Sequence, residues 1–152
     1  MIDYSKLKTL REKTGVSFSL CKKALEESKN NIKDAQKKLN DWGAEKINEK
    51  SNRIVSQGAI FSYVHHNRKI ATLVELLCET DFVANNPEFQ KLGEELTMQL
   101  ASIKAKTAEE LLNQEYIRDS SKKISDLIKE AVLKFGENIK IEKIVRWELG
   151  KK

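Results

Sequence analysis

The first 43 residues carry apolar positions at the spacing of short amphipathic helices. A first helix is predicted to end at Gly15, because helices often finish in a left-handed glycine. A second helix is predicted over Leu20–Glu27, with Ser17 or Ser19 as its N-cap. Cysteine, alanine and leucine recur on one face of this second helix, so it should pack against the first.

A third helix follows a break at Asn30 and Asn31, either of which can cap it. Its apolar stripe consists of Ile32, Ala35, Leu39 and Trp42. Gly43 is predicted to close that stripe. The charged stretch Ala44–Asn52 is rich in helix formers, so we expect it to continue as a helical connector.

From Gln57 the apolar period changes from helical to two, which indicates β-strands. In a first run Ile60, Ser62 and Val64 alternate with Phe61, Tyr63 and His65, and a second run extends from Ile70 to Leu77. The short polar segment His66–Lys69 joins the two runs. This arrangement predicts an antiparallel hairpin.

Three further helices and a last strand are predicted downstream of the hairpin. Asn86 caps a helix with Pro87 at its first position. Thr107 caps a short helix, and Ser120 or Ser121 starts another that ends at Gly136. The apolar stripe of the first of these helices is Phe89, Leu92, Leu96 and Leu100. The final run, with Ile139, Ile141, Ile144 and Trp147 in imperfect alternation, should return as a strand over Ile139–Leu149 in the sheet of the hairpin.

The pattern predicts an α+β fold, in which a three-helix N-terminal module precedes a small antiparallel sheet packed with helices. The expected domains are residues 1–54, the helical module with its connector, and residues 55–152, the α+β core. With 152 residues, of which 39% are hydrophobic and 34% charged, the chain has enough apolar material for a core.

The net charge of +5 does not favour direct nucleic-acid binding, because Lys and Arg are interleaved with Asp and Glu along the chain. Solvated helix faces or an acidic protein partner fit this charge better. There is no glycine-rich phosphate loop, so no bound nucleotide or other cofactor is expected. Adjacent His65 and His66 with Cys78 match no strong metal pattern and support no catalytic arrangement.

Cys21 and Cys78 both lie inside apolar patterns, so we interpret them as reduced thiols in the core. Met1 leads directly into a polar stretch, and no apolar run is long enough to cross a bilayer. We therefore expect a cytoplasmic protein without membrane association.

Two phenylalanines lie at predicted turns, and for each the sequence leaves two alternatives open. Phe82 lies in Thr80–Ala84, between a strand end and a helix cap, where it either packs under the helix or meets a partner. Phe18 follows Gly15 and is either the plug of a small core or an exposed contact.

The seven consecutive residues Cys78–Ala84, in a strand–turn–helix context, resemble the elongation factor Ts family, and this is the most specific of several such segments. Leu10–Gly15 and Cys21–Glu26 are similar to the family's N-terminal module, which itself resembles ubiquitin-associated domains. Similarity is also found in Tyr63–Asn67, Lys134–Ile139 and Arg146–Gly150.

The resemblance implies a guanine-nucleotide exchange factor for elongation factor Tu, a protein that makes and breaks no covalent bond. It implies that Asp81 and Phe82 insert near the partner's magnesium site and weaken GDP binding. The implied partner contacts are Thr80, Asp81, Phe82, Val83 and Ala84 with Val16, Phe18 and Lys22, and His66 is a further possible contact.

The chain also departs from the family. The family usually has glycine, two methionines and aspartate where this chain has Ser17–Leu20. Longer members have two related core halves, and this chain has room for one, so the resemblance implies a homodimer through the sheet module. The competing hypotheses are a helical adaptor fused to a dimerising domain without exchange activity, and a basic RNA-binding protein of the ribosome.

Overall fold

The computed structural model describes residues 1–151, which divide into two compact units. The first comprises Met1–Asn52 and Asp126–Glu137, and the second comprises Arg53–Ser125 with the segment that begins at Asn138. The division after Asn52 lies close to the predicted boundary at residue 54. The first unit is nevertheless discontinuous, because a late helix packs with the N-terminal helices.

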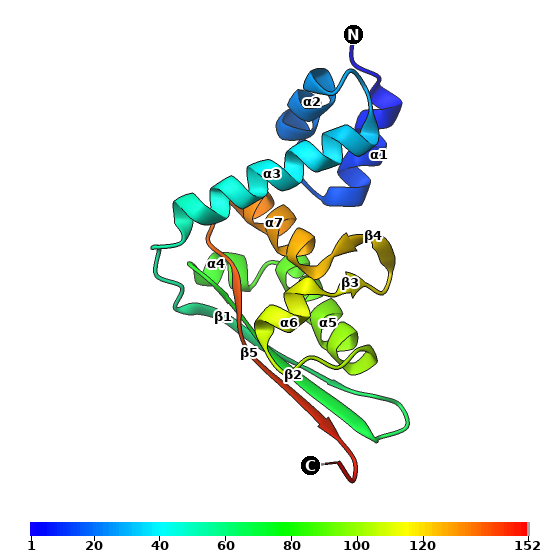
Figure 1. Ribbon diagram of the computed structural model, residues 1–152. Helices are drawn as coiled ribbons and strands as arrows, with labels where there is room; N and C mark the ends of the chain where they lie inside the picture. Colours follow the sequence, from blue (N-terminus) through cyan, green and yellow to red (C-terminus); the bar gives the residue numbers. More distant parts are fainter. Residues whose placement is uncertain (152) are drawn as a thin grey trace. The chain divides into compact units, whose positions relative to one another are not determined.

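Three helices form the N-terminal part of the first unit, as predicted (Figure 1). They are α1 (Tyr4–Thr14), α2 (Phe18–Glu27) and α3 (Ile32–Lys50). Side chains cap all three starts: Asp3, Ser17 and Asn31 each accept a hydrogen bond from a backbone N–H of the first turn. Gly15 ends α1 in the left-handed conformation, with φ 70°.

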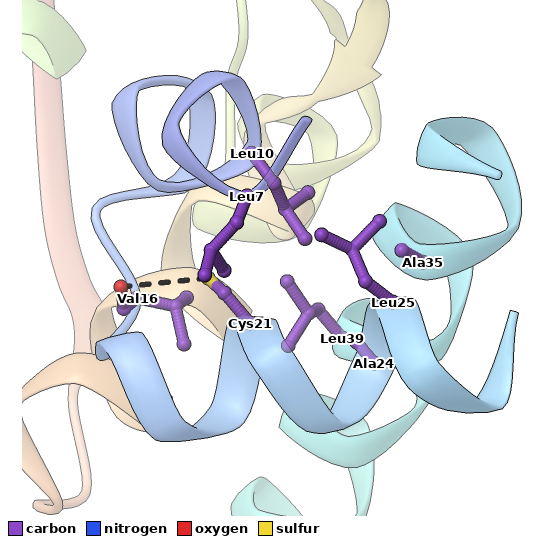
Figure 2. Packing of buried hydrophobic residues seen from close by; sticks show 8 residues of the cluster. All are labelled: Leu7, Leu10, Val16, Cys21, Ala24, Leu25, Ala35 and Leu39. Atoms are coloured by element: carbon purple, nitrogen blue, oxygen red, sulfur yellow. Dashed lines mark hydrogen bonds between the residues drawn. The ribbon is translucent and has the colours of Figure 1, made fainter. Parts of the chain in front are cut away.

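A small cluster of apolar side chains holds this unit together. Figure 2 shows them pointing into the space between the three helices, with the Cys21 thiol donating to the Val16 carbonyl at 3.5 Å. The buried members are Leu7, Leu10, Val16, Cys21, Ala24, Leu25, Ala35 and Leu39. Leu133 of α7 (Ile124–Phe135) packs against the same cluster, which explains why that helix belongs to this unit.

The prediction that Gly43 closes the third helix is wrong, because α3 runs through it to Lys50. A Cβ at Gly43 would lie 2.7 Å from the Cβ of Lys129 and 2.9 Å from its carbonyl oxygen. The glycine therefore permits close approach of α7 to α3. The predicted helical connector is the second half of α3.

The second unit is built on a three-stranded antiparallel sheet in the order β1-β2-β5. The strands are β1 (Gln57–Val64), β2 (Ile70–Cys78) and β5 (Lys140–Glu148), so the predicted hairpin and returning strand are confirmed. The hairpin turn contains Arg68 in the left-handed region, with φ 62°.

Helix α5 (Pro87–Ser102) lies across one face of the hairpin (Figure 1). Asn86 caps it and Pro87 occupies its first turn, as predicted. Gly93 lets α5 approach β1 closely, since a Cβ there would lie 2.1 Å from the Phe61 ring. Helix α6 (Ala108–Asn113) is capped by Thr107, also as predicted.

The prediction that Ser120 or Ser121 starts a helix is wrong. These residues lie in β4 (Asp119–Lys123), which pairs with β3 (Glu115–Tyr116) in a two-stranded ribbon, and α7 begins at Ile124. Asp119 accepts hydrogen bonds from both the backbone N–H and the hydroxyl of Ser121. The polar side chains that suggested a helix cap instead stabilise a turn into this ribbon.

The outer face of the three-stranded sheet, away from α5, carries several exposed apolar side chains. Trp147 was grouped with Ile141 and Ile144, but it lies on this opposite face and is 72% exposed. The cause is a register shift between Val74 and Leu76, which turns both isoleucines inward and leaves Trp147 opposite Ala71. The exposed apolar residues of this outer sheet face are Ile60, Val64, Leu73, Val145 and Trp147.

Candidate functional site

The segment after β2 forms a single helical turn, α4 (Asp81–Ala84), where an exposed turn was predicted. The Thr80 hydroxyl accepts a hydrogen bond from the Val83 N–H at 3.3 Å and caps the turn. The Asn85 N–H donates to the Asp81 carbonyl at 3.0 Å, which closes it. The segment therefore has a defined conformation before it meets any partner.

The two sides of α4 differ sharply in exposure. Phe82 is 85% exposed and Asp81 is also exposed, whereas Val83 and Ala84 are buried. The alternative in which Phe82 packs under the helix is therefore wrong. The buried pair anchors α4 to the rest of the unit, so Val83 and Ala84, predicted as partner contacts, do not present their side chains to a partner in this conformation.

Helix α5 follows α4 after only two residues, so a short connection restrains the C-terminal end of α4. The Asn86 N–H donates to the Val83 carbonyl at 3.0 Å, and the Asn86 side chain accepts from the Glu88 N–H at 2.8 Å. One asparagine therefore links α4 to the start of α5. Phe82 projects from a short helix that is fixed at its end.

The predicted partner contacts of the first unit, in and after the loop between α1 and α2, differ in exposure. Val16 is only 1% exposed, so its predicted role as a surface contact is corrected: its side chain is the core plug. Phe18 is 45% exposed and lies beneath the Arg11 guanidinium, 5.9 Å from the ring centroid. Phe18 is therefore not the plug of the small core, and its role as a partner contact stays a prediction. Lys22, on the next turn of α2, is half-buried.

The histidines lie at the end of β1, at the hairpin turn. The Tyr63 hydroxyl and His65 Nδ1 are 2.8 Å apart, and the His65 and His66 ring centroids are separated by 4.1 Å. His66 is exposed and His65 is half-buried. Since β2 separates this turn from α4, the structure does not bring His66 together with Phe82.

Burial is the main cause of the pKa shifts of Cys21, Tyr116 and Lys134. Burial raises the pKa of the Cys21 thiol, which lies in the core as predicted. Burial, assisted by a hydrogen bond to Glu95, raises the pKa of Tyr116 to about 12. Burial lowers the pKa of Lys134 on α7. None of these groups belongs to α4, so nothing in these shifts makes the Phe82 turn a centre of acid–base chemistry.

Within residues 1–151 no cluster of three or more His, Cys, Asp and Glu side chains is placed to hold a metal ion. Over the same described residues, none of the helices combines the length and the apolar character that a membrane crossing needs. What the chain does present is two exposed phenylalanines on short, capped segments. Exposed aromatic anchors on rigid elements are typical of protein-binding proteins.

Comparison with known proteins identifies the class more closely. The family described as "Elongation factor TS" matches residues 79–152, and the N-terminal family described as "Elongation factor Ts, mitochondrial, N-terminal" matches residues 2–46. The chain belongs to the elongation factor Ts family. The Phe82 turn lies within the first match and the Phe18 loop within the second.

The relatives differ in length. The elongation factor Ts of Coprothermobacter proteolyticus is 36% identical, with 98% of each chain covered. That of Methylacidiphilum infernorum is 35% identical, with 95% of this chain and 93% of the relative covered. That of Clostridium botulinum is 38% identical over 99% of this chain but only 49% of the relative, so the chain spans about half the length of such members.

Proposed function

We propose that this protein is a guanine-nucleotide exchange factor that promotes the release of GDP from elongation factor Tu. The observation that carries the proposal is the position of Phe82, which is 85% exposed on a capped helical turn in a member of the elongation factor Ts family. Asp81 and Phe82 insert into the nucleotide-binding domain of elongation factor Tu, beside its magnesium site. Phe18 and Lys22 of the first unit form a second contact with the same domain.

The mechanism requires no covalent chemistry by this chain. An exchange factor that binds the open form of its partner more tightly than the GDP-bound form lowers the partner's affinity for GDP. By linkage, GDP lowers the partner's affinity for the exchange factor to the same extent. Phe82 supplies this preference by burying its ring only when the nucleotide site opens. Thr80, Val83 and Ala84 support the turn: Thr80 caps it, and the buried pair anchors it to the core. The protein acts in the cytoplasm, where translation elongation takes place.

The direct test is release of a fluorescent GDP analogue from elongation factor Tu, with and without this protein. Wild type should accelerate release, and the Phe82→Ala variant should do so far less. Binding should be measured in parallel, by gel filtration of the complex with nucleotide-free partner. Stable binding without acceleration by wild type would refute the exchange activity and leave a binding adaptor, whereas absence of binding would refute the partner.

We also infer that a second copy of the chain covers the outer sheet face. Its exposed apolar residues come from all three strands, and identical faces can bury one another in a two-fold dimer. Exposed apolar patches of this kind usually mark interaction sites. Sedimentation should therefore give twice the chain mass of 17.4 kDa, and Leu73→Lys should give the monomer. A wild-type monomer at micromolar concentration would exclude this dimer.

A further inference from the structure

Three chain segments meet at the end of the sheet that carries α4. Because the strands are antiparallel, β1 begins, β2 ends and β5 begins at this same end. Arg53 precedes β1, Glu79 directly follows β2, and Asn138 lies just before β5. Glu79 is also the residue immediately before the Thr80 cap of α4. Any interaction that fixes Glu79 therefore acts on the entry to the Phe82 turn.

Glu79 is held from two directions. The backbone N–H of Asn138 donates to Glu79 Oε1 at 2.7 Å, and the Arg53 guanidinium lies 3.5 Å from the same oxygen. The Asn138 side-chain amide donates to the Arg53 carbonyl at 3.2 Å, which completes a closed set of contacts among the three residues. A hydrogen bond from an N–H to an ionised carboxylate is among the stronger ones in proteins.

Two of these three residues are shielded from solvent, whereas the Arg53 side chain is 52% exposed. The Glu79 side chain is only 19% exposed, and Asn138 is buried. A partner would therefore find little of Glu79 to contact. Cys78 on its other side is buried and donates its thiol to the Thr80 carbonyl at 3.1 Å. The backbone between β2 and α4 is thus fixed on both sides of Glu79.

We infer that Glu79, held by Asn138 and Arg53, is a positioning residue for Phe82: it fixes the direction in which the aromatic ring leaves the fold. This inference rests on the proposed exchange function, in which the ring must enter a narrow site. A ring presented in one orientation loses less conformational entropy on insertion than a ring on a mobile turn. The cluster thereby contributes to exchange without touching the partner.

The first measurement does not depend on any partner. Amide hydrogen exchange of Val83 and Asn85 reports whether α4 opens locally, because both N–H groups donate within the turn. Glu79→Ala should speed their exchange, and Glu79→Gln, which keeps an acceptor oxygen, should preserve it. Glu95→Ala is the matched control, since Glu95 is another mostly buried carboxylate, paired with Arg118 at 2.6 Å, away from α4.

The second measurement is a double-mutant cycle on GDP release from elongation factor Tu. Glu79→Ala should slow release on the order of tenfold in the wild-type background and leave the rate unchanged in the Phe82→Ala background. Glu95→Ala should change neither. Equal slowing in both backgrounds would overturn the inference, because Glu79 would then act independently of Phe82.

The two proposals fail in different ways. If Phe82→Ala itself releases GDP as fast as wild type, the insertion mechanism fails, while unchanged protection of α4 in Glu79→Ala refutes the positioning role by itself. If Glu79→Ala does not fold, Glu79→Asp takes its place, because the shorter side chain draws the carboxylate back from both the Asn138 N–H and the Arg53 guanidinium. Unchanged protection of α4 in that variant would likewise refute the cluster's role.

Discussion

The substitution Phe82→Ala should reduce exchange activity with little effect on the stability of the free protein. The ring is 85% exposed, so the free protein buries little of it and loses little by its removal. Complete burial of a phenylalanine side chain contributes about 1.5–3 kcal/mol, and the 15% that is buried here accounts for roughly 0.2–0.5 kcal/mol. The thermal midpoint of the variant should therefore lie close to that of the wild type.

The same arithmetic gives the expected loss of activity. If the exposed 85% becomes buried only in the open complex with elongation factor Tu, the ring contributes about 1.3–2.5 kcal/mol to that complex and little to the encounter complex. At about 1.36 kcal/mol per factor of ten, release of GDP should slow by roughly ten- to seventy-fold. Encounter with the GDP-bound partner should change much less.

The assay is stopped-flow release of a fluorescent GDP analogue at a series of factor concentrations. The plateau rate reports release from the complex, and the half-saturating concentration reports the encounter. The expected result is a lower plateau with a similar half-saturating concentration. Circular dichroism melting of each variant establishes that the fold is unchanged.

Tyr4→Ala is the control, since it removes another exposed aromatic side chain, from α1, outside the predicted contacts. It should release GDP at the wild-type rate. If Phe82→Ala loses less than about twofold, or if Tyr4→Ala loses as much, the burial argument is refuted. A large fall in melting temperature of Phe82→Ala would contradict the observed exposure of the ring.

Three further predictions concern the fold that carries the site. Gly93→Ala should destabilise the second unit by about 1–3 kcal/mol in urea unfolding, because a Cβ would lie 2.1 Å from the Phe61 ring. The double variant with Phe61→Leu should regain part of the loss, and an unchanged urea midpoint in Gly93→Ala would contradict the close approach of α5 to β1. Arg146→Met should lower the free energy of unfolding by about 1–3 kcal/mol, since the Arg146 guanidinium donates to the carbonyls of Leu100 and Ala101 at 2.9 and 3.1 Å at the end of α5. A loss below about 0.5 kcal/mol would show that water replaces the guanidinium as donor. The pKa of Tyr116, raised to about 12 from 10, means that folding favours the neutral phenol, so its contribution to stability is complete below pH 10 and is lost as the pH rises from 10 through 12. Tyr116→Phe should flatten the fall of the urea midpoint over that range, and an identical pH dependence in both proteins would argue against the assignment.

The features that the sequence predicted are those set by neighbouring residues. Asn31, Asn86 and Thr107 cap the helices that they were expected to cap, and Gly15 and Gly136 end α1 and α7 in the left-handed conformation. Each of these signals depends on hydrogen bonds within one turn of the chain. The hairpin was predictable for the same reason, because the two-residue alternation of its strands can be read from adjacent residues.

The errors at Gly43, at the two phenylalanine loops and at Trp147 originate in contacts between distant segments. Gly43 has the local signal of a helix end, and only the contact with α7 explains why a glycine lies in the middle of α3. In the two phenylalanine loops, the local sequence does not indicate which apolar residue becomes buried. Trp147 changes face because β5 carries one extra residue between Ile141 and Ile144, and only the pairing with β2 fixes its position. In each case a local signal allows two outcomes, and packing selects one.

For the candidate site, the order of residues alone placed an aromatic side chain between the end of a strand and a capped helix. The packing of the folded chain is what leaves Phe82 facing solvent while Val83 and Ala84 face the core. It also brought Asn138 to Glu79, 59 residues away along the chain. Caps and turns are satisfied by hydrogen bonds between near neighbours. The side of a one-turn helix that becomes buried depends instead on which surface the rest of the chain presents to it.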